Sequence, residues 1–235
     1  MGPFELVRVR REGAVSVVTM DRPAKRNAMN LQMVAELRAA LEEEGTDEAV
    51  AAIVLTGEGS SFSAGADRAR LAGLEGEELA RMLAAGTIAR PLADVILQVV
   101  AMAKPVVGAI NGPAVGGGLI LAISCDYRVA AQDAQFWMPE AGMGRAIGTP
   151  SLEILLLCTG PLVAKDIVLT GRRFSAEELE RLHLLNQIVP AHEVLATAMR
   201  QAHEFTKCSA GVLGSVKSRA NAAMVEIWKR SVRDC

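Results

Sequence analysis

A single carboxylate, Glu140, stands in a run of apolar and glycine residues, FWMPEAGMG at 136–144. Burial in such a run raises the pKa of a carboxyl group, which suits a side chain that must take up and return a proton near neutral pH. The same residue could instead be a turn glutamate that points to solvent. Other parts of the sequence must decide between the two interpretations.

Two loops of small residues could bring backbone N–H groups against a bound group. The segment FSAGAD at 62–67 follows an apolar segment, and its small side chains would let a ligand approach the main chain. The glycine run at 116–118 comes directly before a predicted helix, where unpaired N–H groups and the helix dipole favour negative charge. Each loop taken alone could also be a plain packing turn.

The elements that would carry these residues alternate between strand and helix. β-branched and apolar segments predict strands at 5–10, 14–20, 52–56, 105–110 and 126–131. Helices are expected at 31–44 with Asn30 as N-cap, at 92–101, and directly after the glycine run, where the helix lacks a polar face. This alternation predicts an α/β fold with parallel strands.

After residue 150 the pattern becomes mainly helical. Ser175 and Glu178 fit a capping box, residues 185–189 a short extended piece, and 191–207 and 210–234 two further helices. We expect this C-terminal pair of helices either to pack on a neighbouring subunit or to fold back onto the core.

Composition argues against several classes of protein. The formal net charge of -2 and the aromatic content of 3% argue against a surface for nucleic acid or anionic membranes. The cysteines form no C-x-x-C pair and have no histidine at metal-ligand spacing, which predicts no metal site and reduced thiols. Because the N-terminal segment lacks the apolar core of a signal peptide, we expect a cytoplasmic protein without a membrane span.

Taken together and in this order, these segments resemble the crotonase family, the enoyl-CoA hydratase/isomerase superfamily. The resemblance covers nearly the whole chain and rests on the segments DRP to NAM at 21–29, FSAGAD at 62–67, NGPAVGGG at 111–118, CDYRVA at 125–130 and Pro139-Glu140. It implies a spiral of ββα units over residues 1–185, with an acyl-CoA site. It also implies a C-terminal helical segment, residues 186–235, that assembles homotrimers, or hexamers as dimers of trimers.

The resemblance also assigns roles to single residues. The N–H groups of Ala64 and Gly117 are expected to form an oxyanion hole for the enolate of a thioester, with Glu140 moving the proton. Residues expected to border the CoA part of the substrate are Lys25, Arg26, Ala28, Ala64, Ala66, Asp67 and Gly117. Of these, Asp67 is expected mainly to hold its own loop. No cofactor is implied other than the coenzyme A of the substrate.

The sequence departs from the hydratase pattern at one position. Hydratases of this family carry a second glutamate two residues after the glycine run, where this chain has Ile120. A single glutamate resembles the enoyl-CoA isomerases, which convert 3-enoyl-CoA to 2-enoyl-CoA. A hydratase or lyase acting on an unusual acyl-CoA remains an alternative, as does a non-catalytic acyl-CoA-binding subunit. Arg145 could meet either solvent or a substrate carboxylate.

Overall fold

The computed structural model describes residues 4–67, 89–144, 147 and 151–233. Its main sheet has six strands in the order β1-β2-β3-β4-β6-β9. The first pair is antiparallel, and each later neighbour pairs in parallel. The strands are β1 (Val7–Glu12), β2 (Val15–Met20), β3 (Ala52–Gly57), β4 (Val106–Ile110), β6 (Tyr127–Ala131) and β9 (Gln187–Val189). The predicted α/β fold with parallel strands is therefore confirmed.

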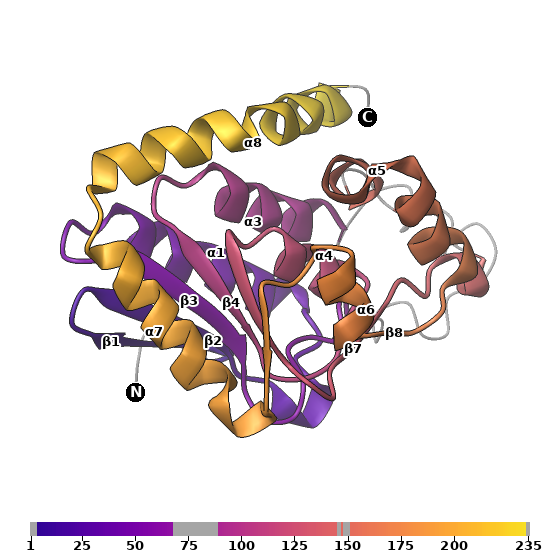
Figure 1. Cartoon of the computed structure of the whole chain (residues 1–235), viewed down its shortest axis with the longest axis horizontal. Helices are drawn as coiled ribbons and strands as arrows, with labels where there is room; N and C mark the ends of the chain where they lie inside the picture. Colours follow the sequence, from indigo (N-terminus) through magenta and orange to yellow (C-terminus); the bar gives the residue numbers. More distant parts are fainter. Residues whose placement is uncertain (1–3, 68–88, 145–146, 148–150, 234–235) are drawn as a thin grey trace.

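Helices cover both faces of this sheet (Figure 1). α1 (Leu31–Thr46) and α3 (Ala89–Ala101) lie on one face, and α7 (Val194–Thr206) crosses β3 and β4 on the other. Every residue of β3 and β4 is buried, as expected for parallel strands covered on both sides. α1 begins where the sequence predicted, because the Asn30 side chain accepts a hydrogen bond from the Met33 N–H at 2.8 Å.

A second, small sheet lies beside the first and was not predicted. It joins β5 (Ala114–Val115), β7 (Gln135–Trp137) and β8 (Phe174–Ser175) in the order β5-β7-β8. Phe136 and Phe174 face each other across β7 and β8, and both are buried. This sheet links the glycine turn to the segment that carries Glu140.

The remaining helices differ in how deeply they are buried. In α4 (Gly117–Ile123) every residue except Gly117 is buried, in agreement with the predicted helix without a polar face. α5 (Ser151–Thr170) is broken at Gly160, whose φ is 72°, directly before Pro161. α6 (Ala176–Arg181) begins with the predicted capping box of Ser175 and Glu178. No helix within the described ranges is long and apolar enough to cross a membrane.

The C-terminal helix α8 (Ala210–Arg233) folds back along α3 (Figure 1). The Asn221 side chain donates to the Val100 carbonyl at 2.9 Å, and Trp228 is only 6% exposed. Val212 and Val216 on the same helix stay largely exposed. β9 and α7 lie beyond residue 185, where the boundary between the core and the assembly segment was expected. The main sheet and the helices that cover it therefore include residues from both sides of this boundary. The division into these two units remains a prediction.

Candidate active site

The two small-residue loops leave the carboxyl ends of neighbouring parallel strands. The loop with FSAGAD follows β3, and the glycine turn follows β4. Ligands of open parallel sheets bind at this edge, just outside the strand ends. The loops are joined by two backbone hydrogen bonds, from the Ser63 N–H to the Pro113 carbonyl at 3.2 Å and from the Val115 N–H to the Ser63 carbonyl at 2.9 Å.

Glycine at two positions permits this close approach. Gly65 has a φ of +80°, and a Cβ there would fall 2.5 Å from the Val115 carbonyl oxygen and 3.3 Å from the Gly117 nitrogen. A Cβ on Gly118 would fall 2.5 Å from the Ser63 carbonyl oxygen. Any larger residue would therefore push the two turns apart.

The N–H groups of the two turns are used unequally. The Ala64 N–H donates to the Arg26 carbonyl at 2.8 Å and so is not directed at a substrate oxygen in this structure. Its place in the oxyanion hole stays a prediction, which this hydrogen bond does not favour. Among the hydrogen bonds of the described residues, none uses the N–H of Ala66 or of Gly117. Gly117 is the first residue of α4, so its N–H has no partner within the helix. Both residues are partly exposed.

Glu140 is brought to the glycine turn by the small sheet. β5 pairs with β7 so that Val115 lies opposite Trp137, and the Gly116 N–H donates to the Trp137 carbonyl at 3.0 Å. A Cβ on Gly116, whose φ is +52°, would fall 2.6 Å from Oε1 of Glu140. The other carboxyl oxygen, Oε2, is buried. The carboxylate thus faces the residue that precedes Gly117 and not bulk solvent.

Ile120 lies one turn further along α4. Its side chain is fully buried and belongs to the hydrophobic core of the protein. The position where the resemblance would place a second glutamate is therefore occupied by packed hydrocarbon.

Asn27 organises the site, although it was not among the predicted site residues. It is fully buried with a φ of 52°, a left-handed conformation that asparagine tolerates better than most residues. Its Nδ2 donates to the carbonyls of Glu58 and Ser61 at 2.9 and 2.7 Å, and its Oδ1 accepts from the Arg22 N–H at 2.9 Å. The Ser63 hydroxyl donates to its carbonyl. Asn27 therefore fixes the segment at 22–29 onto the FSAGAD loop.

Asp67 is bound to the segment at 22–29, and its role in holding its own loop stays a prediction. Its Oδ2 lies 2.5 Å from Nη1 of Arg22, which also donates to the Ala28 carbonyl. The Asp67 N–H donates to the Met29 carbonyl at 2.8 Å. Lys25 and Arg26 on the same segment are exposed, and Ala28 is half-buried. Arg145 lies outside the described residues.

A cleft of about 410 Å³ opens next to these loops. Its lining residues are Arg26, Ser61, Ala64, Pro113, Val115, Gln135, Trp137, Pro139, Met143 and Arg173. A larger cleft of about 670 Å³ lies between β1, β2 and α7, but none of the predicted site residues lines it. The smaller cleft is lined by two of the predicted site residues, Arg26 and Ala64. Across the described part of the chain, no three His, Cys, Asp or Glu side chains are grouped to hold a metal ion.

The family model for enoyl-CoA hydratase/isomerase matches residues 10–232 of this chain. The chain belongs to the enoyl-CoA hydratase/isomerase family. Its sequence is 32% identical over 220 residues to a probable enoyl-CoA hydratase, echA8, of Mycobacterium bovis, covering 94% of this chain and 82% of that protein.

Solved structures of this family have the same fold. An enoyl-CoA hydratase/isomerase from Xanthobacter autotrophicus superposes with a TM-score of 0.86 at 26% identity, covering 98% of this chain and 86% of that one. A monofunctional enoyl-CoA isomerase from M. smegmatis gives a TM-score of 0.77 at 30% identity, covering 94% of both chains. Proteins named as hydratases and as isomerases are thus both similar to this chain, so the choice of reaction depends on its own residues.

Proposed function

We propose that this member of the enoyl-CoA hydratase/isomerase family is an enoyl-CoA isomerase that moves a double bond from position 3 to position 2 of an acyl thioester. The observation that supports this choice is the carboxylate of Glu140 beside the glycine turn, with the buried Ile120 at the position where hydratases of the family carry a second glutamate. Moving a double bond needs one group that takes and returns a proton, and no water molecule enters the reaction.

The proposed mechanism begins with a backbone oxyanion hole. The N–H groups of Ala66 and Gly117 would donate to the thioester carbonyl oxygen, with Ala66 replacing Ala64 in this role. Removing a proton from carbon 2 puts negative charge on that oxygen, and one such preorganised donor stabilises it by roughly 2.7–4 kcal/mol. The dipole at the start of a helix acts in the same direction at Gly117.

Glu140 would carry out both proton transfers. Its carboxylate takes the proton from carbon 2, and the electrons of that C–H bond move to the carbonyl oxygen through carbon 1. When the enolate collapses, the double bond forms between carbons 2 and 3, and Glu140 returns the proton to carbon 4. Atoms and charge balance without a further reactant.

The CoA part of the substrate would lie along the segment with Lys25, Arg26 and Ala28 and the loop with Ala64, Ala66 and Asp67. This arrangement is supported by the cleft that Arg26 and Ala64 line together. Assembly into trimers or hexamers and a cytoplasmic location remain predictions.

Incubation of the purified protein with pure 3-enoyl-CoA tests the proposal. We expect the absorbance of the conjugated 2-enoyl thioester to rise. The matched substrate, 2-enoyl-CoA, should lose little absorbance, because hydration is not expected. If 3-enoyl-CoA of no chain length gives a rise in absorbance, while 2-enoyl-CoA is consumed, isomerisation is refuted as the main activity.

Hydration, or lyase chemistry on an unusual acyl-CoA, is the second candidate, and the names of relatives favour it. The probable hydratase of Mycobacterium bovis and the crotonyl-CoA hydratase of Syntrophomonas wolfei, 33% identical over 222 residues, are both hydratases by name. Under this alternative Glu140 alone would activate water, and the absorbance of 2-enoyl-CoA would fall. Binding of CoA thioesters without turnover of either substrate would instead support a non-catalytic acyl-CoA-binding subunit.

A further inference from the structure

Two guanidinium groups line the cleft beside the proposed site, and the described lining residues include no carboxylate. One belongs to Arg26, which the family resemblance places beside the CoA. The other belongs to Arg173, more than a hundred residues further along the chain and not among the predicted site residues. The remaining lining is mainly apolar or aromatic. An apolar cleft with positive charge at its edge suits a ligand with an apolar stem and an anionic group.

The small sheet holds Arg173 in this cleft. β7 and β8 are antiparallel with Phe136 opposite Phe174, so Arg173 lies across from Trp137 and on the same face. Its guanidinium carbon lies 4.8 Å from the centre of the Trp137 ring, a cation–π contact. Its Nη1 donates to Oε1 of Gln135 at 3.1 Å. Both partners are uncharged, so they orient the guanidinium without neutralising it.

The adjacent arginine shows what a purely structural role looks like. Arg172 forms ion pairs with Asp166 at 3.0 Å and Glu178 at 2.8 Å, and its guanidinium lies over the Phe174 ring. These two carboxylates neutralise it, and it does not line the cleft. Within the described residues, no carboxylate is at ion-pair distance from either Arg173 or Arg26. The charge in the cleft is therefore left for a ligand.

We propose that Arg173, together with Arg26, binds an anionic group of the thioester substrate: a phosphate of its CoA part or a carboxylate on its acyl part. This inference rests on the proposed function, since it takes the ligand to be a CoA thioester. Arginine suits both groups because its planar fork of donors matches the oxygens of phosphate and carboxylate. Arg173 would be a specificity-determining residue that does not take part in the proton transfer.

Binding measured by calorimetry on wild type, Arg173→Gln and Arg172→Gln tests this inference without relying on turnover. The probes are CoA, pantetheine, butyryl-CoA and glutaryl-CoA, which differ in phosphate groups and in a terminal acyl carboxylate. We expect Arg173→Gln to weaken binding of at least one anionic probe by about fivefold to tenfold, because exposed charge-assisted hydrogen bonds are partly screened by solvent. Arg172→Gln is the matched control and should bind all four probes like wild type.

The pattern of losses identifies the anion. A loss for CoA with unchanged pantetheine binding assigns Arg173 to a phosphate. If wild type binds glutaryl-CoA more tightly than butyryl-CoA, and Arg173→Gln loses only this difference in affinity, Arg173 is assigned to the acyl carboxylate. Affinities of Arg173→Gln within about twofold of wild type for all probes overturn the inference, and so does an equal loss in Arg172→Gln. If wild type itself binds no CoA compound, the proposed function fails and this inference fails with it.

Discussion

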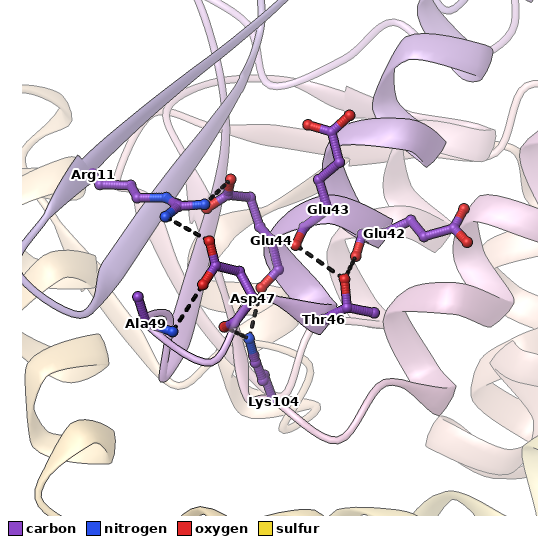
Figure 2. Close-up of polar contacts among 8 residues, drawn as sticks. All are labelled: Arg11, Glu42, Glu43, Glu44, Thr46, Asp47, Ala49 and Lys104. Carbon is purple, nitrogen blue, oxygen red and sulfur yellow. Dashed lines mark hydrogen bonds and ion pairs between the residues drawn. The ribbon is translucent and has the colours of Figure 1, made fainter.

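At the amino ends of the parallel strands, charged side chains hold the loops. At the carboxyl ends, ion pairs such as Arg22–Asp67 also hold the loops, but the two turns beside Glu140 meet through main-chain contacts of small residues. Figure 2 shows the first arrangement. The Arg11 guanidinium binds both carboxyl oxygens of Glu44 at 2.8 and 2.7 Å and Oδ2 of Asp47 at 2.8 Å. Lys104, just before β4, donates to the carbonyls of Glu44 and Asp47 at the end of α1.

A second ion pair continues this arrangement to the C-terminal helix. Nζ of Lys217 on α8 lies 2.6 Å from Oδ2 of Asp126 and donates to the Lys104 carbonyl at 2.9 Å. The same carboxyl oxygen accepts from the Val106 N–H at 2.7 Å. Lys217 is only 8% exposed. The amino ends of β4 and β6 and the helix α8 are therefore fastened together through side chains.

This difference implies a division between stability and catalysis. At the amino ends, charged groups and helix carbonyls bind one another, so few polar groups remain to contact a ligand. Removing one of these charged groups should reduce stability. Where two N–H groups stay available beside a carboxylate, substitution should change the rate. Substitutions at the two edges can test this division.

The largest effect is expected from Glu140→Gln. Glutamine has nearly the same shape but cannot take up the proton, so kcat should fall by about 10²–10⁴. Steady-state kinetics with 3-enoyl-CoA measure this, and thermal unfolding should show a midpoint close to wild type. Activity that falls less than about tenfold would mean that Glu140 does not transfer the proton.

Gly65→Ala should have the next largest effect on rate. Its Cβ would meet the Val115 carbonyl, separate the two turns and misplace one donor, which lowers kcat/KM by about 10²–10³. Gly13→Ala is the matched control, because its φ is +59° but nothing lies within 4 Å of an added Cβ. The control should lose about 1–2 kcal/mol of stability from left-handed strain and keep its activity. Equal kinetic losses in both variants would contradict the contact between the turns.

Lys217→Met should change stability without changing the rate. The substitution leaves the Asp126 carboxylate without its cation, and breaking a buried pair in this way costs about 3 kcal/mol of the free energy of unfolding. Lys229→Met on the same helix is the control, because its pair with Glu226 is exposed and should contribute at most about 1 kcal/mol. Urea unfolding at equal protein concentration measures both. A similar loss in both variants, or a large fall in kcat for Lys217→Met, would break the division between the two edges.

The smallest effect is a pH dependence of this ion pair. Burial lowers the pKa of Lys217 below its usual 10.5, although Asp126 opposes the shift. Between the lowered pKa and 10.5 the unfolded chain binds more protons than the folded one, so this lysine makes stability rise with pH in that window. The difference in unfolding free energy between wild type and Lys217→Met should therefore widen from pH 7.5 towards 10. If the difference in unfolding free energy instead becomes smaller towards pH 10, the pKa of Lys217 is shifted in the opposite direction.

Local signals made much of this fold predictable. The start of α1 depends on Asn30 and Met33, and the start of α6 on Ser175 and Glu178, so each pair lies within a few residues. The buried helix after the glycine run was predictable because it lacks a polar face. In contrast, β7 and β8 are only three and two residues long, too short for a pattern, and they form through pairing with distant segments.

The site was predictable as a set of segments but not atom by atom. The sequence shows two alanines around Gly65 and does not reveal that the Arg26 carbonyl uses the N–H of Ala64. Asn27 was missed because two of its three side-chain partners, Glu58 and Ser61, are more than thirty residues away. Arg173 was missed because it faces Trp137 only once the small sheet has formed.

If the N–H groups of Ala66 and Gly117 are the donors, ordinary substitutions cannot delete them, since every amino acid except proline keeps its peptide N–H. Side chains around the turns can then diversify under selection while the charge-stabilising pair persists. New acyl specificities could arise in this scaffold through neighbours such as Met143 and Arg173, without rebuilding the reactive centre.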